Sequence, residues 1–555
     1  MSAGAGSGAG SGTAAEGSGA TVARSGAVMA AGTMTSRLLG VLRASLLAGV
    51  IGTEGVTADV FQTANTLSNQ FYLLLAGGVL NAVLVPQIVR AGANDDGGED
   101  FVNRLVTAAL ALVGVATVVA LALAPVLVRI YLDVDDPHAV ALATTFAFIC
   151  LPQIFFYGLY TLLGQVLNAH SRFGAYMWAP VLANVVAIAG LIWFRASGQP
   201  SQAPVTEWTP AMIWILAGTA TLSIAVQAVS LLIPLRRIGF RYRPRWGFRG
   251  FGFGSALHVA KWTLAAVVVS QLGFVVTSRV MSHAGALGHA RHLTVPSRAT
   301  FDNAFLIFML PHSLVTVSLV TALFTRMAHA ARAGDRPALV ADLARGLRMP
   351  AVLLVPGVAI AIAFAPTITA TFFFANRPDQ TQAVATLMPA LLVGVIPFGW
   401  FYLSERFFYA HEDARTPFMA QLLVTSVATV ITLVASTLDP RHTGILVGAG
   451  QSTAYLAGAV LGFALIRRRI GLLGLRGVAG TYLRLALPAV AWAVALALLV
   501  HWTLPDLTSD RLLGAGVLLL VGAVELVGTL GVAHLLGVRE VADLLVPVLR
   551  RVRRP

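Results

Sequence analysis

The chain is a succession of long apolar stretches separated by short polar segments. Each stretch has the roughly 20 residues that a helix needs to cross about 30 Å of hydrocarbon. The stretches are continuously apolar and rich in Ala, Leu and Val, whereas a barrel would show short alternating segments, so the pattern predicts helices. The fourteen expected spans are residues 27–51, 58–90, 102–131, 138–168, 174–195, 211–235, 255–282, 298–329, 346–374, 382–410, 416–437, 443–466, 481–502 and 512–537.

The composition is that of a membrane protein. Hydrophobic residues make up 57% of the 555 residues and charged residues only 11%, about half the charged fraction of a soluble domain. We therefore expect an all-α polytopic membrane protein. Residues 1–20 lack the features of a signal peptide, and the Gly/Ala/Ser-rich segment 1–26 is predicted to be a flexible cytoplasmic tail.

Basic residues fall in alternate polar segments, with the densest run, "RRIGFRYRPRWGFRG", at 236–250. Because positively charged loops stay in the cytoplasm, this alternation predicts that both termini are cytoplasmic. Loop 282–300 departs from the rule, since Arg291 and Arg298 fall on the expected outer side, so this hairpin is expected to dip into the membrane or to line a cavity. Topology and anionic lipid headgroups account for the net charge of +14 without a nucleic-acid partner.

An internal repeat divides the chain. The segments "LLGQVLNAHSRFGAYMWAP" and "YLSERFFYAHEDARTPFMAQ" share an Ala-His pair, at 169–170 and 410–411, where a helix is expected to end at a short cytoplasmic turn. Two halves of six helices have the same topology, as in transporters whose substrate site lies between the halves. The predicted organisation is a tail at 1–26, a six-helix lobe at 27–237, a basic linker at 238–254, a second six-helix lobe at 255–470, a two-helix appendix at 471–537 and a basic cytoplasmic tail at 538–555.

Two arginines, Arg37 and Arg43, interrupt the first apolar span. An arginine at the centre of a membrane helix costs about 2.5 to 3.5 kcal/mol, so both are expected to face protein or water. They lie six residues apart, roughly 120° around the helix, and would line one broad cationic wall with Ser36 and Gly40 beside them. The alternative is that Arg43 reaches a lipid headgroup and Arg37 pairs with Asp59.

The second half carries its own ionisable residues inside apolar spans. Lys261 and Arg279 fall in the seventh span, and Arg298 and Asp302 fall at the start of the eighth. These residues predict a second, mostly basic group. Two basic walls that face each other across a cleft suit a polyanion such as a pyrophosphate.

Sequence motifs for catalysis or nucleotide-driven transport do not occur. The chain has no G-x-x-x-x-G-K-[ST], H-E-x-x-H or C-x-x-C, so we expect neither an enzyme nor a cofactor. The spacing of His283, His289 and His292 matches no standard metal site, and we expect solvated loop histidines rather than metal ligands. Two small-residue pairs predict close helix packing: Gly444 with Gly448, and Gly458 with Gly462.

Several segments carry a family resemblance. "TMTSRLLGVLRASLLAGVIG", "ADVFQTANTLSN" and "AGGVLNAVLVPQI" near the N-terminus, and "QVLNAHSRFGAYMWAPVLAN" and "RFFYAHEDARTPF" further on, resemble the MurJ (MviN) lipid II flippases over roughly residues 27–470. The resemblance implies a transporter of the multidrug/oligosaccharidyl-lipid/polysaccharide exporter superfamily in the bacterial plasma membrane. Such a protein moves lipid II, the undecaprenyl-pyrophosphate-linked peptidoglycan precursor, from the inner to the outer leaflet by alternating access. The cell-wall synthesis machinery then becomes a candidate partner.

The resemblance also implies roles for individual residues. Arg37 and Arg43 match the family's cavity arginines on the first helix, and Asp59 matches its acid on the second. The last two helices would form the apolar groove for the polyprenyl tail.

At other positions the chain departs from the family pattern. It has Tyr72 and Leu73 where several members carry arginines, and Phe305 and Leu306 where they carry an Asp-Arg pair. The cationic cavity is therefore expected to be thinner, with the basic residues of the second half as partial replacements. Either the headgroup contacts have moved, or the chain carries another lipid-linked cargo.

Three alternatives stay open at this point. A Wzx-like flippase of another polyprenyl-linked glycan would share most of these features. A drug/cation antiporter of the same superfamily would want an acidic pocket, for which Asp302 is the plausible lobe acid near mid-membrane. A non-transporting membrane scaffold would not need Arg37 and Arg43 inside a helix.

Overall fold

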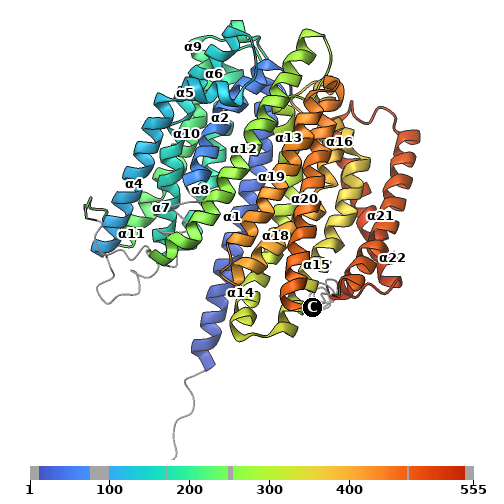
Figure 1. Ribbon diagram of the computed structural model, residues 1–555. Coiled ribbons are helices and arrows are strands. Elements are labelled where there is room, and N and C mark those ends of the chain that lie inside the picture. The colour runs from blue at the N-terminus through green and yellow to red at the C-terminus, as the bar shows by residue number, and fades with distance from the viewer. Residues whose placement is uncertain (1–11, 76–98, 171, 248–253, 472–473, 544–555) are drawn as a thin grey trace, which may run out of the picture.

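The computed structural model describes residues 12–75, 99–170, 172–247, 254–471 and 474–543, and within these ranges every regular element is helical. The helices form one bundle in which they run side by side along a common direction (Figure 1). Parts of the second expected span, the basic linker and the basic C-terminal tail lie outside the described residues. The fold is therefore the expected all-α architecture.

The bounds of the elements follow the expected spans. The first half comprises α1 (Gly12–Ile51), α2 (Val56–Leu75), α4 (Glu99–Ala122), α5 (Ala124–Tyr131), α6 (Pro137–Cys150), α7 (Gln153–Ala169), α8 (Phe173–Ala196), η2 (Val205–Glu207), α9 (Pro210–Ile213), η3 (Trp214–Gly218), α10 (Thr219–Ser230) and α11 (Leu232–Arg237). The remainder comprises α12 (Gly254–Ala290), α13 (Arg298–Pro311), η4 (His312–Thr316), α14 (Val317–Ala333), α15 (Arg336–Ala363), α16 (Ala365–Phe372), α17 (Pro378–Leu392), α18 (Val395–Ala410), α19 (Arg415–Ser436), α20 (Pro440–Ile470), α21 (Leu475–Thr503) and α22 (Arg511–Leu535).

The described residues contain 12 helices long and apolar enough to cross a membrane, or 13 if the bent pair α17–α18 counts as one span. These correspond to all the expected spans except the second. That span, 58–90, is described only as far as Leu75, where α2 ends. The chain is thus a multi-pass membrane protein, and the described residues account for thirteen of the fourteen spans expected from the sequence.

Several spans are broken rather than continuous. Pro125, Pro152 and Pro366 each lie at the start of the helix that follows a break, because proline lacks the backbone donor and its ring clashes with the preceding turn. Helices α17 and α18 meet at 47°. The residue at that bend is Gly394, where a Cβ atom would lie 2.5 Å from the Ser452 Oγ, so close packing against α20 requires glycine there.

The N-terminal tail differs from the expectation. Residues 12–26 form the first turns of α1, so a flexible tail at 1–26 is wrong for this part of it. This stretch holds as many glycines as alanines, so intrinsic helix propensity does not explain why the helix of the first span extends through it. Residues 1–11 lie outside the described residues.

Buried apolar side chains form separate clusters in the two halves. The largest cluster lies within residues 50–240 apart from Ala299, and a second lies within residues 281–459 apart from Ala48. A smaller cluster joins α15 to the last two helices through residues such as Ala351, Leu485 and Ala533. Each half therefore has its own core, and few buried apolar residues cross between them.

The repeated Ala-His pairs have the same local structure. Both helices end at the alanine, and the following histidines, His170 and His411, have φ,ψ of −92°, 16° and −98°, 14°. In each case the ring Nδ1 lies within hydrogen-bond distance of the carbonyl oxygen four residues earlier, 2.9 Å from Val166 and 2.8 Å from Phe407. The expectation that each pair ends a helix is confirmed.

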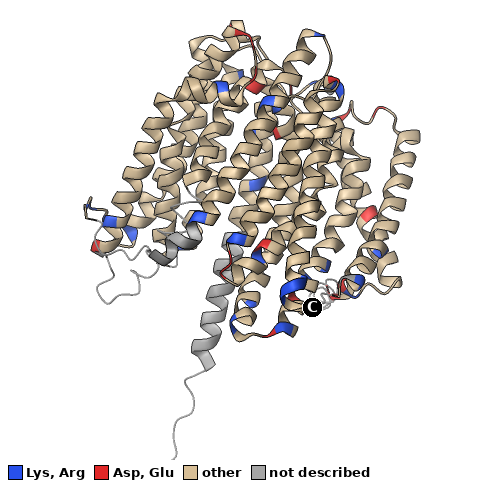
Figure 2. Cartoon of the chain, in the orientation of Figure 1, with Lys and Arg blue, Asp and Glu red and all other residues tan. Residues whose placement is uncertain are grey.

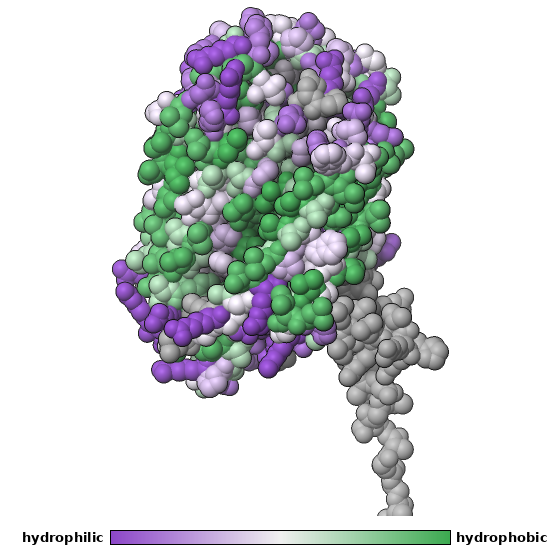
Figure 3. All heavy atoms as spheres, turned by 90° about the vertical axis from the view of Figure 1, so that its right-hand side faces the viewer, coloured by the Kyte–Doolittle hydropathy of each residue, from purple (hydrophilic) through white to green (hydrophobic). Residues whose placement is uncertain are grey.

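The two ends of the bundle differ in charge (Figure 2). The end at which α1 begins, here called the arginine-rich end, and the opposite end, here called the acidic end, are separated by an apolar band on the face that carries α21 and α22 (Figure 3). The helix ends and turns of the arginine-rich end carry Arg104, Arg236, Arg237, Arg332, Arg336, Arg467, Arg468 and Arg469. Those of the acidic end carry Glu54, Asp133, Asp135, Asp136, Asp506 and Asp510 together with Arg195, Arg291, Arg377, Arg441 and Arg511.

Candidate functional site

The two halves are joined at the acidic end by the Asp59 carboxylate. It is 1% exposed, and its Oδ1 accepts hydrogen bonds from the Ser297 Oγ and the Ala299 backbone N–H, each at 2.7 Å. Ser297 caps α13 and Ala299 lies in its first turn, where the helix leaves N–H groups unpaired and carries partial positive charge. The carboxylate thus holds α2 of the first half against the start of α13 in the second.

Further hydrogen bonds surround this contact. The Thr53 Oγ1 donates to the Gln380 carbonyl at 2.7 Å, and the Thr53 carbonyl accepts from the Thr300 Oγ1 at 3.0 Å. The Asn376 Nδ2 donates to the Ala48 carbonyl at 2.8 Å. We call this set the acidic-end closure: Ala48, Thr53 and Asp59 with Ser297, Ala299, Thr300, Asn376 and Gln380.

Arg279 forms a second link near the same end. It pairs with Asp133 at 2.7 Å and donates to the Arg129 carbonyl at 2.8 Å, which ties α12 to the first half. The side chains of Arg279 and Asp133 are 42% and 41% exposed. Because solvent screens a pair this exposed, it contributes about 1 kcal/mol or less to the contact between the halves. The buried acidic-end closure therefore contributes more to this contact than the Arg279–Asp133 pair.

Arg298 is the largest fully buried side chain of the described residues, at 1% exposure. Its Nε donates to the Ser278 Oγ at 2.9 Å, its guanidinium lies 4.7 Å from the Phe274 ring centroid, and it forms an ion pair with Asp302. A charge in such an interior is tolerated only with a partner. Asp302 therefore neutralises Arg298. Asp302 also lines a space enclosed between α13 and the first half.

That space is a central cavity of about 360 Å³ between α13 and the helices of the first half. Its charged lining residues are Arg43 and Asp302. Amide side chains add hydrogen-bonding groups: Gln153 lines the wall and its Nε2 donates to the Asn65 Oδ1 at 3.2 Å. Phe305 lines it as well. The cavity can accept an anionic group beside one arginine and polar groups around it.

Arg37 lies outside this lining, six residues towards the arginine-rich end. Its Nη1 donates to the Ser313 Oγ in η4, so α1 also touches the second half at this depth. Arg37 does not pair with Asp59, because Asp59 lies at the acidic end and is bound there by α13. The alternative that Arg37 is held by this acid is therefore wrong.

Ser36 and Gly40, expected beside the arginines, pack α1 on α8. The Asn184 Nδ2 donates to the Ser36 carbonyl at 2.9 Å. A Cβ atom on Gly40 would lie 3.9 Å from the same nitrogen. Both residues thus support the helix that presents Arg43 rather than line the cavity.

The basic residues expected to gather in the second half are spread along the bundle. Lys261 and Arg279 lie near opposite ends of α12, about 27 Å apart at 1.5 Å per residue. Lys261 lies 5.5 Å from the Trp262 ring centroid, which Arg415 also approaches at 5.7 Å. One wall containing both Lys261 and Arg279 is therefore wrong. Substrate contacts by Lys261, Arg279 and Arg298 stay predictions.

The departures from the family pattern leave apolar and aromatic groups at the expected positions. Tyr72 stacks on Tyr157, a cavity residue, at 5.3 Å between ring centroids, and its hydroxyl lies 2.5 Å from the Thr161 Oγ1. Phe305 and Leu306 line the cavity itself. Arg43 is the basic residue in the cavity lining of the described residues, and a cationic cavity thinner than that of the family stays a prediction.

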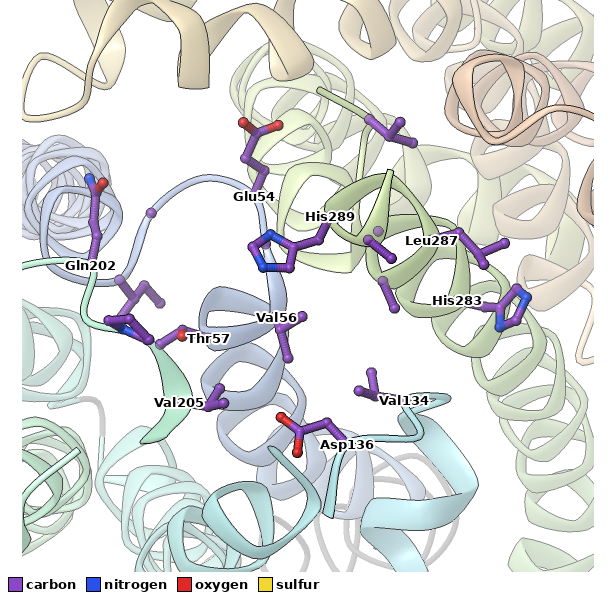
Figure 4. Close-up of a pocket in the computed structure, with 18 of the residues that line it drawn as sticks. Glu54, Val56, Thr57, Val134, Asp136, Gln202, Val205, His283, Leu287 and His289 are labelled. Carbon is purple, nitrogen blue, oxygen red and sulfur yellow. The ribbon is translucent and has the colours of Figure 1, made fainter. Parts of the chain in front are cut away.

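A second pocket, of about 670 Å³, lies on the other side of the closure. In Figure 4, His289 and Asp136 lie on opposite sides of it, and His283 lies farther along α12. Along α2, the pocket residues precede Asp59 and the cavity residues follow it. The closure thus separates the pocket from the central cavity. Among the described residues, no group of three or more His, Cys, Asp or Glu is placed to hold a metal ion.

Two helical halves with their own cores, joined by polar contacts and enclosing a cavity between them, define a membrane transporter. The family model described as "Lipid II flippase MurJ" matches residues 47–513, and the chain belongs to this family. A relative from Rhizobium meliloti (strain 1021), named "Probable lipid II flippase MurJ", is 26% identical over 90% of both chains. "Lipid II flippase MurJ" of Burkholderia cenocepacia is 27% identical over 85% of this chain and 88% of its own.

Solved structures agree on the fold. A lipid II flippase MurJ in an inward closed conformation has a TM-score of 0.68 at 16% identity, over 90% of this chain and 98% of its own. An inward-facing multidrug resistance MATE family transporter of the MOP superfamily has a TM-score of 0.64 at 17% identity, over 80% and 98%. The fold is shared across the superfamily, whereas the family model and the relatives favour a lipid II flippase over a Wzx-like flippase or a drug/cation antiporter.

Proposed function

We propose that this lipid II flippase holds the pyrophosphate of its substrate at Arg43 and releases it across the membrane when the acidic-end closure opens. The observation that carries this proposal is the position of Arg43, the basic residue in the lining of the central cavity, on the inner side of the closure. A guanidinium fits phosphate oxygens with two parallel hydrogen bonds. The amide groups of the same wall would bind the polar headgroup beyond the pyrophosphate.

Arg37 would meet the substrate first. It lies about 9 Å from Arg43 along α1 towards the arginine-rich end, and Ser313 is its partner in the absence of a charged ligand. A hydroxyl is a weaker partner than a phosphate. A phosphate that enters from the arginine-rich end would therefore displace Ser313 and pass from Arg37 to Arg43.

The orientation follows from the same path. We propose that the arginine-rich end, with both termini, faces the cytoplasm of a bacterial cell and that the acidic end faces outwards. The distribution of arginine supports this orientation. The closure then blocks the outer side while the cavity is loaded from the inner leaflet. Transport would make or break no covalent bond, and association with cell-wall synthesis enzymes stays a prediction.

The test is rescue of a bacterial strain depleted of its own lipid II flippase. We expect the wild-type chain and the control variant Arg332→Ala to restore growth, because Arg332 is exposed in the last turn of α14. We expect Arg43→Ala to fail and Arg37→Ala to be impaired, with membrane levels of all four checked by immunoblot. Growth supported equally by Arg43→Ala would overturn the assignment of Arg43. Failure of a well-expressed wild type would point to another lipid-linked cargo.

A further inference from the structure

A groove separate from the central cavity opens on the lipid-facing surface near the arginine-rich end. It has a volume of about 960 Å³ and lies between α20 and α21, with Trp400 of α18 among the residues that line it. Its walls are apolar, and Val460 and Leu483, one from each wall, are 62% and 61% exposed. Its lining also includes Arg467 and Arg468, from the last turn of α20.

We propose that this groove binds an anionic phospholipid, with its phosphate on Arg467 and Arg468 and one acyl chain between α20 and α21. The site belongs to neither the cavity nor the acidic-end closure. The proposal therefore stands independently of where the pyrophosphate of the transported lipid binds.

The charge of the two arginines supports an anionic headgroup. Both are exposed, and neither takes part in an ion pair with a carboxylate of the described residues, whereas the next residue, Arg469, lies 3.4 Å from Asp413. Two adjacent guanidinium groups at the level of the headgroups attract a phosphate and can bind it through several N–H donors. A zwitterionic headgroup would be attracted less strongly, because the arginines repel its own cationic group.

The length of the groove matches an acyl chain of a phospholipid better than a polyprenyl chain. From Arg467 to Ala459 the α20 wall runs about 12 Å, at 1.5 Å per residue, and the hydrocarbon of one leaflet is about 15 Å deep. One acyl chain of a leaflet lipid fits this length from its headgroup towards the midplane. The polyprenyl chain of lipid II is several times longer and would extend far beyond it.

Side-chain contacts hold one part of the groove lining in a fixed shape. The Trp400 Nε1 donates to the Tyr482 hydroxyl at 2.7 Å, and this hydroxyl donates to the Leu347 carbonyl at 2.8 Å. Tyr482 belongs to α21, whereas Trp400 and Leu347 belong to α18 and α15. The apolar surface is therefore preformed, and a lipid that fills the groove would fasten α21 to the second half.

The experiment compares lipid retention by purified protein. Wild type and variants are purified from membranes, exchanged into mixed micelles with equal phosphatidylglycerol and phosphatidylcholine, and analysed by native mass spectrometry. We expect wild type to retain phosphatidylglycerol in preference to phosphatidylcholine. For the double variant Arg467→Gln/Arg468→Gln, we expect the ratio of retained phosphatidylglycerol to retained phosphatidylcholine to fall at least five-fold. The matched control, Arg332→Gln/Arg336→Gln, changes the net charge equally on a turn at the same end and is expected to retain it.

A second variant keeps the charges and fills the groove. Ala464→Trp places an indole between the walls at a lipid-exposed position, and we expect it to lose phosphatidylglycerol as the double variant does. Gel filtration of each variant verifies folding. Equal retention of the two lipids by wild type, unchanged retention by both test variants, or displacement of phosphatidylglycerol by equimolar undecaprenyl phosphate would overturn the proposal.

Discussion

Single charged residues were the part of the site most readable from the sequence. Arg37 and Arg43 stand out because a charge inside an apolar span is costly, and the structure places both against protein. The partner of Asp59 was not readable, because its donors lie some 240 residues away at the start of α13. Polar groups at helix ends follow no period, so only the folded chain shows which of them meet.

The buried pair of Arg298 and Asp302 leads to a stability prediction. Asp302→Ala leaves the Arg298 charge unpaired in an apolar interior, which costs about 3 to 5 kcal/mol. We expect the thermal unfolding midpoint of the purified protein to fall by several degrees. The double variant Arg298→Met/Asp302→Leu removes both charges and is expected to recover most of the loss. A double variant as unstable as Asp302→Ala would show that the pair stabilises the fold by more than mutual neutralisation.

At the scale of elements, length and apolar content identified the spans, and two features refined them. Proline positions explain the breaks that divide α4 from α5 and α15 from α16. The pairs of small residues on α20 do allow close packing, since a Cβ on Gly458 would lie 2.4 Å from the Val424 Cγ2. The groove between α20 and α21 was not expected from the sequence, although the "RRR" run at 467–469 marks its mouth.

The packing of α20 can be tested with a matched pair of substitutions. Gly458→Val forces an overlap with Val424 and Phe401, and overpacking of this kind costs about 1 to 3 kcal/mol. We expect lower yield of monodisperse protein and a lower unfolding midpoint. Gly522→Val on α22 is the control, because a Cβ there meets no atom within 4 Å. Equal effects of the two substitutions would refute the packing role of Gly458.

The π-helical turn η4 contains a buried histidine whose replacement is expected not to destabilise the protein, unlike the two substitutions above. His312 is 2% exposed, its ring centroid lies 4.2 Å from that of Phe398, and its Nδ1 has no hydrogen-bond partner among the described residues. An unpaired buried polar atom costs about 1 to 3 kcal/mol. We therefore expect His312→Phe to leave the unfolding midpoint unchanged or to raise it. A fall of several degrees, measured in the same detergent, would mean that the imidazole is required.

At the scale of the whole molecule, the two halves followed from the internal repeat, and their separate cores agree with that division. The way in which the halves touch did not follow from it. The acidic-end closure depends on residues from α1, α2, α13 and α17 and from the segments before α2 and α17, which the sequence gives no reason to combine. Which of the two ends is closed is a property of the folded molecule alone.

The closure can be opened by substitution. Asp59→Ala removes the acceptor of three buried donors, the Ser297 hydroxyl and the backbone N–H groups of Arg298 and Ala299. Each donor left unpaired costs about 1 to 3 kcal/mol, so the closed form should lose at least a factor of ten in population. We expect Gln62→Cys, in the cavity lining, to react at least five-fold faster with a membrane-impermeant maleimide added from the side that the acidic end faces. Cys150, the native cysteine, is buried and adds little background.

The exposed pair provides the control for this measurement. Asp133→Ala breaks the pair with Arg279, which solvent already screens, and we expect labelling of Gln62→Cys to change by less than two-fold. If Asp133→Ala opened the cavity as far as Asp59→Ala, the surface pair rather than the buried closure would control access.

The closure consists mainly of hydrogen bonds, with few apolar side chains shared between the halves. When it opens, water can satisfy each donor and acceptor, so the net cost per bond is about 1 kcal/mol, whereas parting a large apolar interface would cost far more. We therefore expect the closed and open forms to lie within a few kcal/mol of each other, so a phosphate that binds the open form more tightly by a similar amount would reverse their order. For the same reason, we expect the opening of the closure to be sensitive to solutes that alter the activity of water at the acidic end.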